Sequence, residues 1–437
     1  MPAAAQVIYE EHGIYKKDRC RRIDLEQGAF RSVAAFEGNP DYEKLTERRS
    51  ALYKRKDDIR SEFARDYTRI LHSLAYRRMK SKTQVFYNAA GSDHICTRIE
   101  HVSHVESVAG TIGKFLGLNL ELIKAIAMGH DLGHAPFGHE GEKTLSALSE
   151  KYLGKPFWHE KNGLRLVDRV ELLEDNFRHF KNLDLTYAVR DGIISHCGEV
   201  DDNGIKPRKE FIDLETEFKS AGEFQPITWE GAVVKLADKI AYLGRDIEDA
   251  LTLGILDRGE VKTLEEMAGD ESDGAINTGV IMHGMIIDVC ENSSPEEGIS
   301  LSRDALKRLV RIKKFNYEHI YNSRWLDPFV HYSELVLCEL FMALSDVYDG
   351  DRTFERINDA VRFYPNLMKN FGDWLARYVT LPGAKLTISG FERPECDNDK
   401  IYGGLENERI YTQAVIDYIA GMTDKYAIST YQELLRY

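Results

Sequence analysis

Two imidazoles and two carboxylates in this chain have the types and positions of a divalent-metal site. His130 and Asp131 are adjacent and follow the apolar run 122–128, which is typical of a buried helix. Burying a histidine beside an aspartate costs free energy unless another group pairs with them. For the dipeptide alone, the plainer interpretation is a capping aspartate next to a core histidine. The metal hypothesis therefore depends on further ligands elsewhere in the chain.

His101 and Asp238 are the two candidates for those ligands. His101 lies on a predicted helix just before the dipeptide, and Asp238 interrupts the apolar stripe of a long predicted helix after Thr228. A carboxylate in such a stripe needs a counter-charge. The mixed nitrogen and oxygen set suits Mn²⁺, Fe²⁺ or Zn²⁺ and, less well, Mg²⁺. Three helices can bring these groups together and leave positions open for water and phosphate oxygens.

Helical periodicity dominates the chain from about residue 45 to its end and predicts an all-α fold. Proline is scarce, with 11 residues, and there is no internal repeat or run of short strands. The 14 histidines are uneven, and nine of them lie between His94 and His196, which places the chemistry in the N-terminal half. The predicted helices cover residues 62–80, 98–116 with a stop at Gly117, 120–128 capped by Asn119, a segment from about His139, and 229–253 capped by Thr228.

Composition describes an ordinary globular protein. The 437 residues are 43% hydrophobic and 30% charged. No apolar run reaches the roughly 18 residues that cross a bilayer, and residues 1–22 lack the apolar core of a secretory signal. The six cysteines are far apart without a Cys-x-x-Cys pair, so we expect reduced thiols and a cytoplasmic protein with no membrane contact. The net charge of −14 argues against attraction of the whole surface to DNA.

Six blocks, in order, carry a resemblance to a known family. They read YRRMKSKTQVF, TRIEHVSHVESVA, AIAMGHDLGHAPFGHEGE, WHEKNGLRLV, ADKIAYLGRDIEDA and VIDYIAGMTDKYA. The chain resembles the deoxyguanosine triphosphate triphosphohydrolases (dGTPases), which are HD-domain phosphohydrolases, from about residue 60 to 435. The resemblance implies an N-terminal arm over 1–60, a helical HD-domain core over 61–330, and additional C-terminal helices packed on the core over 331–437.

The resemblance also implies roles for individual residues. His101, His130, Asp131 and Asp238 are expected to bind the metal, with Mn²⁺ or Mg²⁺ preferred and Fe²⁺ or Zn²⁺ as alternatives. The expected catalytic residues are His134, His139, Glu142 and His159. His139 and Glu142 are spaced i, i+3, so the carboxylate could orient the imidazole. His104 and His196 are interpreted as structural neighbours.

Substrate contacts are expected from eight residues: Gln84, Arg98, Lys239, Tyr242, Asp246, Lys313, Tyr317 and Tyr321. The resemblance assigns the 3′-hydroxyl to Gln84 and Asp246, the phosphates to Arg98 and Lys239, and the sugar to Tyr242. The spacing i, i+4, i+8 of Lys313, Tyr317 and Tyr321 would place all three on one side of a helix, with Tyr321 against C2′. Core packing of the tyrosines and a solvated Lys239 are the alternatives.

The reaction that the resemblance implies is hydrolysis of dGTP, or of other dNTPs, to the deoxynucleoside and inorganic tripolyphosphate. Two alternatives stay open: another HD-domain nucleotide phosphohydrolase, or a regulator that binds nucleotides or single strands. An allosteric dNTP, single-stranded DNA as an effector, and a homo-oligomer of four or six subunits are further expectations from the resemblance.

Overall fold

The computed structural model describes residues 28–50, 58–86, 95–175, 178–197, 203–257, 259, 260, 262, 278–380, 387, 388, 391, 392 and 396–436. These residues form an all-α fold, as predicted. The only strands among them are two short antiparallel pairs, β1 (Leu172–Glu174) with β2 (Phe180–Asn182) and β3 (Thr387–Ile388) with β4 (Phe391–Glu392). None of the described helices has the length and apolar composition needed to cross a membrane.

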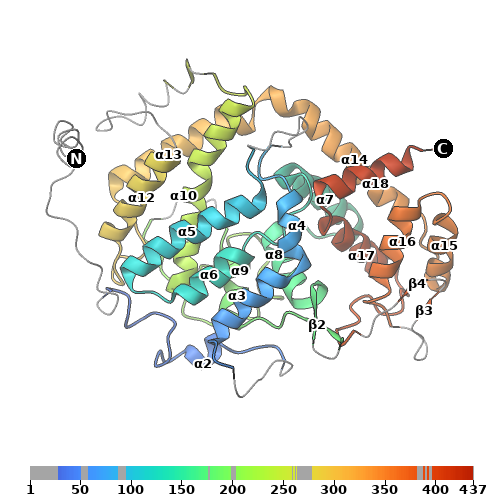
Figure 1. Cartoon of the computed structure of the whole chain (residues 1–437), viewed down its shortest axis with the longest axis horizontal. Helices are drawn as coiled ribbons and strands as arrows, with labels where there is room; N and C mark the ends of the chain where they lie inside the picture. Colours follow the sequence, from blue (N-terminus) through green and yellow to red (C-terminus); the bar gives the residue numbers. More distant parts are fainter. Residues whose placement is uncertain are drawn as a thin grey trace, which may run out of the picture.

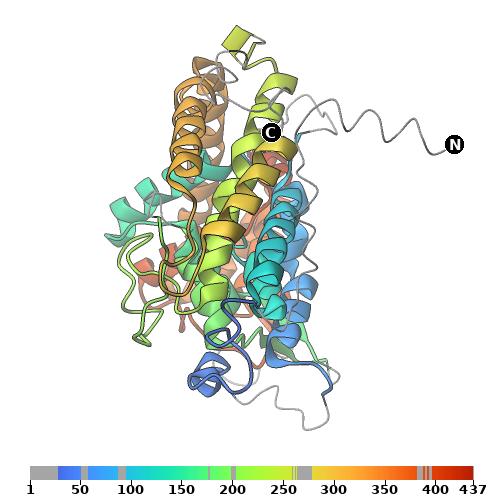
Figure 2. The same cartoon turned by 90° about the vertical axis from the view of Figure 1, so that its left-hand side faces the viewer.

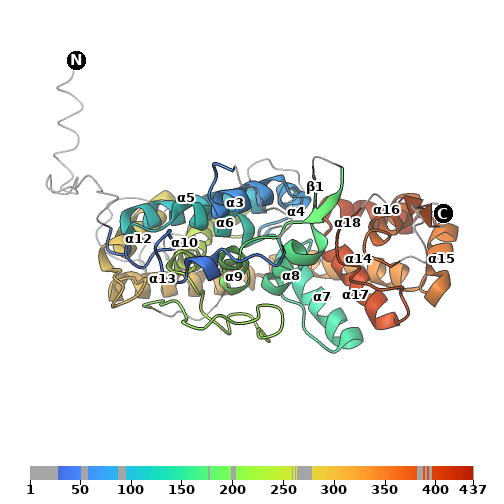
Figure 3. The same ribbon diagram turned by 90° about the horizontal axis from the view of Figure 1, so that it is seen from below.

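The molecule is flat and elongated, with α12 and α13 toward one end and α15 and α16 at the other (Figures 1 and 3). The helices of the first part are α2 (Tyr42–Leu45), α3 (Glu62–His72), α4 (Leu74–Arg78), α5 (Arg98–Leu116), α6 (Leu120–Gly129), α7 (Gly138–Leu153), α8 (His159–Arg165), α9 (Tyr187–Ser195) and α10 (Trp229–Thr252). Those of the second part are α12 (Thr278–Asn292), α13 (Arg303–Phe315), α14 (Asp327–Ser345), α15 (Thr353–Ala360), α16 (Pro365–Leu375), α17 (Glu408–Ala420) and α18 (Asp424–Leu434). Short 3₁₀ and π turns, η1 (Met79–Ser81), η2 (Leu166–Val170), η3 (Asn316–Tyr321), η4 (Arg324–Leu326) and η5 (Gly350–Arg352), connect some of them.

The helices that carry the predicted metal ligands pack together in one hydrophobic cluster. α5 contacts both α6 and α10, and α3 covers α6 (Figures 1 and 2). The sequence predicted their ends well: α5 stops at Gly117, whose φ of 81° is left-handed, and Asn119 caps α6. The predicted N-terminal arm, described over residues 28–50 and 58–60, also joins this cluster through the fully buried Phe30.

The helix predicted over residues 62–80 is interrupted. Ser73 has extended backbone angles, with φ −66° and ψ 152°, and separates α3 from α4. Its buried hydroxyl donates to the Ile70 carbonyl at 2.8 Å and accepts from the Tyr76 amide at 3.1 Å. The serine thereby ends one helix and caps the next, because its side chain replaces the missing helical partners.

A second hydrophobic cluster joins the C-terminal helices to buried residues between Ala135 and Leu172. Phe371 and Tyr411 lie in its centre, together with Phe137 and Leu145 from the N-terminal half. α14 and α17 pack on α7, at the right of Figure 1. Residues 135–172 therefore share a core with the C-terminal helices, so the hydrophobic clusters do not divide at residue 330.

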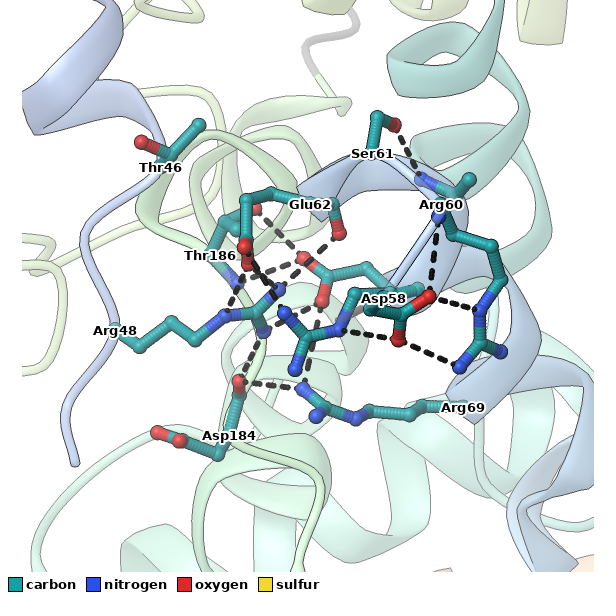
Figure 4. Close-up of polar contacts among 12 residues, drawn as sticks. Thr46, Arg48, Asp58, Arg60, Ser61, Glu62, Arg69, Asp184 and Thr186 are labelled. Atoms are coloured by element: carbon teal, nitrogen blue, oxygen red, sulfur yellow. Dashed lines mark hydrogen bonds and ion pairs between the residues drawn. The ribbon is translucent and has the colours of Figure 1, made fainter. Parts of the chain in front are cut away.

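A buried ion-pair network fixes the chain before α3 to the turn before α9 (Figure 4). Arg48 donates to the fully buried Asp66 at 2.6 Å and also pairs with Glu62 at 2.7 Å. The other oxygen of Asp66 accepts from the amide and the hydroxyl of Thr186, at 2.8 and 2.7 Å. The network is hydrogen-bonded on both sides, as a buried charge requires.

Candidate metal centre and active site

The four predicted metal ligands come together from three helices. α5 supplies His101, the end of α6 supplies His130 and Asp131, and α10 supplies Asp238. The Nε2 atom of His101 lies 2.9 Å from Asp238 Oδ1 and 4.0 Å from Asp131 Oδ2. The Nε2 atom of His130 lies 3.7 Å from Asp131 Oδ1 and 3.8 Å from Asp238 Oδ1.

The state of His130 shows that this group fits a divalent cation. Its Nδ1 atom lies 2.7 Å from the Ala127 carbonyl and donates to it, which leaves a lone pair on Nε2. That Nε2 atom is buried and has no hydrogen-bond partner within the described residues. Buried polar atoms are normally satisfied, and a free imidazole lone pair facing two carboxylates is a metal-ligand arrangement.

The carboxylates of Asp131 and Asp238 both favour the ionised form. Burial alone would raise the pKa of Asp131, but nearby His134 and Arg98 outweigh it and hold that pKa well below its usual range. Burial would also raise the pKa of Asp238, but the hydrogen bond from His101 outweighs it and lowers that pKa below its usual range. Two ionised carboxylates, Asp131 buried and Asp238 partly buried, provide the charge that a divalent cation requires.

The four expected catalytic residues lie beside this centre, but their pairing differs from the expectation. Glu142 accepts from the backbone amide of His159 at 2.8 Å and from its ring Nδ1 at 3.1 Å. His139, expected to be its partner, lies 3.7 Å from the carboxylate and its side chain is 65% exposed. The ring of His159 stacks on His134 with centroids 3.7 Å apart. Glu142 therefore orients His159.

The two stacked imidazoles have opposite protonation preferences. Burial opposes protonation of His159, but the carboxylates of Glu160 and Glu142 outweigh it and raise the pKa of His159 to about 9. Burial and the nearby Arg98 guanidinium hold the pKa of His134 well below its usual range. At neutral pH, His159 is thus a cation able to donate a proton, and His134 is neutral.

Arg98 and Gln84 approach the centre from the side of η1. Arg98 is 1% exposed and donates to Asp131 Oδ2 at 2.8 Å and to the Gln84 carbonyl at 3.2 Å. The side-chain Oε1 of Gln84 is buried without a hydrogen-bond partner among the residues that the structure describes. That atom is an acceptor left available to a ligand.

The other expected substrate contacts lie on α10, α13 and η3. Lys239 and Asp246 are buried and Tyr242 is partly buried, and the Tyr321 hydroxyl donates to Asp246. Burial raises the pKa of Asp246 to about 7. The stripe expected from Lys313, Tyr317 and Tyr321 is not one regular helix, because α13 ends at Phe315 and η3 is a π turn. Such a turn changes the angular spacing of side chains, and Tyr317 is 37% exposed.

Two buried residues of the site were not assigned a function from the sequence. The ring of His196 lies between His130 and His159, with centroids 4.9 and 5.4 Å away, and is one of the groups that could hold a metal ion. Glu160 is 1% exposed, and neither of its oxygens has a hydrogen-bond partner within the described chain. The clustering of histidines signalled His196, whereas adjacency to His159 was the only signal for Glu160.

Comparisons with known proteins agree with this geometry. The HD domain matches residues 98–243 and the phosphohydrolase-associated domain matches residues 400–433. A deoxyguanosinetriphosphate triphosphohydrolase-like protein from Caldanaerobacter subterraneus subsp. tengcongensis is 34% identical over 385 residues, 88% of each chain. Proteins of the same name from Desulfatibacillum aliphaticivorans and Clostridium perfringens are 33% and 32% identical, over 86% of this chain and 88% of theirs. The chain therefore belongs to the deoxyguanosinetriphosphate triphosphohydrolase-like family of HD-domain proteins.

Proposed function

We propose that this protein is a metal-dependent deoxynucleoside triphosphate triphosphohydrolase, with dGTP as the first substrate to test. The reaction converts a dNTP and water into the deoxynucleoside and tripolyphosphate. The observation that carries the proposal is the buried His130 Nε2, which has no hydrogen-bond partner among the described residues and faces Asp131 and Asp238 beside the His134–His159 stack. The names of the relatives support the choice of substrate.

His101, His130, Asp131 and Asp238 would hold the metal ion, and Mn²⁺ or Mg²⁺ is the proposed ion. When bound, a divalent cation polarises a phosphate oxygen and lowers the pKa of bound water. The donor set of two imidazoles and two carboxylates allows this, because it leaves positions open for other oxygens. The imidazoles are kept in place by the Ala127 carbonyl and the helix packing around α5.

Proton transfer is assigned to His159. Water attacks the α-phosphorus, the bond from that phosphorus to the 5′-oxygen breaks, and the departing 5′-oxygen needs a proton. His159 is protonated at neutral pH and is held by Glu142 on its Nδ1 side. Its other ring nitrogen, Nε2, is the atom we assign to donate the proton. General acid catalysis of this kind contributes roughly 10²–10⁴-fold.

Substrate recognition is assigned to the residues around the Asp246–Tyr321 pair and Gln84 Oε1, which has no hydrogen-bond partner in the part of the chain that the structure describes. Gln84 has an acceptor for a sugar hydroxyl, and Asp246 lies two helical turns beyond Asp238 on α10. Lys239 supplies positive charge on the same helix. A chain with a net charge of −14 needs such local cations to bind a triphosphate.

Product analysis tests this proposal. The protein is incubated with each dNTP and Mn²⁺, and the products are separated by anion exchange. Tripolyphosphate with the free deoxynucleoside is the expected result. Release of monophosphate or pyrophosphate favours another HD-domain phosphohydrolase, and binding without turnover favours a regulator. Repeating the assay with pairs of dNTPs and with single-stranded DNA tests the expected effectors, and light scattering tests the expected tetramer or hexamer.

A further inference from the structure

The C-terminal GMTD block, residues 421–424, has no part in the chemistry above. Its aspartate nevertheless contacts the loop between His134 and α7, which we call the active-site loop. Asp424 begins α18 and is 4% exposed. Its Oδ1 accepts from the amide of Phe137 and its Oδ2 accepts from the amide of Thr83, both at 2.8 Å. One carboxylate therefore bridges two segments that are more than 50 residues apart in sequence.

These two amides belong to the segments that place the site residues. Phe137 lies between His134 and α7, which carries Glu142, and its φ of 65° is left-handed. Such a conformation persists in a residue with a side chain only where its surroundings hold it. Thr83 immediately precedes Gln84. A Cβ added to Gly138 would lie 3.1 Å from the Gln84 carbonyl, so the two segments are in close contact.

Lys82 makes a second connection at the same place. Its ammonium group donates to the carbonyl of Ala420 at 3.0 Å and to the carbonyl of His134. The lysine is 3% exposed. Asp424 is thus hydrogen-bonded to the backbone amides of Thr83 and Phe137, and the Lys82 side chain links Ala420 to the backbone of His134.

We propose that Asp424 is a positioning residue for catalysis, through which the C-terminal helices hold the active-site loop in its working geometry. The inference rests on the proposed function. This role requires a carboxylate, because each of its two oxygens accepts a hydrogen bond from one backbone amide. An asparagine has only one acceptor oxygen, and its NH₂ group would face an N–H donor.

Glu433 provides a matched control on the same helix. Its Oε1 and Oε2 accept from the amides of Asn366 and Leu367, each at 3.0 Å, and it is 8% exposed. It therefore resembles Asp424 in burial and bonding, but it caps α16 instead of the active-site loop. Glu433→Gln measures the effect of losing such a bond away from the site.

The test compares Asp424→Asn with Glu433→Gln in the full-length protein. Both should lower Tm, but only Asp424→Asn should lower kcat, by about 10- to 100-fold, because small misplacements of reacting groups are that costly. Metal content should stay unchanged and KM should change less than kcat. Equal kcat values in wild type and Asp424→Asn, or equal losses in both variants, would overturn the inference.

Hydrogen exchange keeps the inference separate from the proposed function. Asp424→Asn should speed amide exchange in peptides containing Thr83 and Phe137, whereas Glu433→Gln should do so around Asn366. If the wild type hydrolyses no dNTP, the proposed function fails. The exchange pattern still shows whether Asp424 holds the segments of Thr83 and Phe137 in place. If Asp424→Asn does not fold, Lys82→Met takes its place. A folded Lys82→Met protein with normal exchange at residues 134–137 would contradict the proposal.

Discussion

Glu142 accepts two hydrogen bonds from His159, one from the backbone amide at 2.8 Å and one from the ring at 3.1 Å. The same carboxylate lies 3.7 Å from the exposed ring of His139. The arrangement holds the ring of His159 against His134, whereas the side chain of His139 is 65% exposed. This geometry is the reason that we propose His159, and not His139, as the proton donor.

We expect His159→Gln to lower kcat by at least about 10²-fold, the usual contribution of acid catalysis, with metal content retained. His139→Gln is the matched control and should lose much less, because its ring is largely exposed. Steady-state rates of dGTP hydrolysis measure the loss of kcat in both variants. A larger loss in His139→Gln would reverse the assignment.

Metal content tests the ligand set. Asp131→Asn and His101→Gln should each release the metal, since each removes a ligand atom from the buried group. His196→Gln should keep it, because we assign the second imidazole to His101. Elemental analysis after dialysis, with helix content followed by circular dichroism, provides the measurement. Full metal content in Asp131→Asn would contradict the ligand set.

Asp246 should make the stability of the metal-free protein depend on pH. Burial raises its pKa to about 7, whereas an exposed carboxyl titrates near pH 4. Between about pH 4 and 7 the folded state binds the extra proton, so its stabilisation is complete at low pH and is lost as the pH rises through 7. The free energies of unfolding of wild type and Asp246→Asn, measured with urea, should therefore change differently with pH between about pH 4 and 7. Parallel curves would show that Asp246 has an ordinary pKa.

The buried network around Asp66 should contribute strongly to stability. Asp66→Ala leaves Arg48 with one carboxylate fewer and the Thr186 amide without its acceptor. Breaking a buried pair costs about 3–5 kcal/mol. Asp304→Ala is the control, because that carboxylate is 90% exposed in its pair with Lys307, and surface changes usually stay within about 0.5 kcal/mol. Denaturant unfolding compares the two, and equal losses would contradict the role given to the network.

Local signals in the sequence predicted the helices that carry the proposed metal ligands. Asn119 and Thr228 cap their helices by bonds to nearby amides, and Gly117 supplies a left-handed stop, so each end depends on residues close in sequence. The apolar stripes then placed His101, His130 and Asp238 on helices that pack together. The choice of the four proposed ligands came from the family resemblance, because caps and stripes alone do not determine which helices pack together.

Contacts between distant segments could not be predicted in the same way. Glu142 bonds to His159 although it is spaced for His139, because α8 approaches α7 only in the folded chain. Asp424 contacts Phe137 across 287 residues. The π turn η3 also alters the regular spacing expected for Tyr317 and Tyr321, since periodicity assumes an unbroken α-helix.

Hydrolysis of dGTP in ¹⁸O-labelled water tests the central claim most directly. If water attacks the α-phosphorus, the label enters one terminal phosphate of tripolyphosphate and the deoxyguanosine stays unlabelled. We predict this result by ³¹P NMR and mass spectrometry for the wild type, and its loss in Asp238→Asn. Label in inorganic phosphate or pyrophosphate, or product formation that survives in Asp238→Asn, would contradict the account.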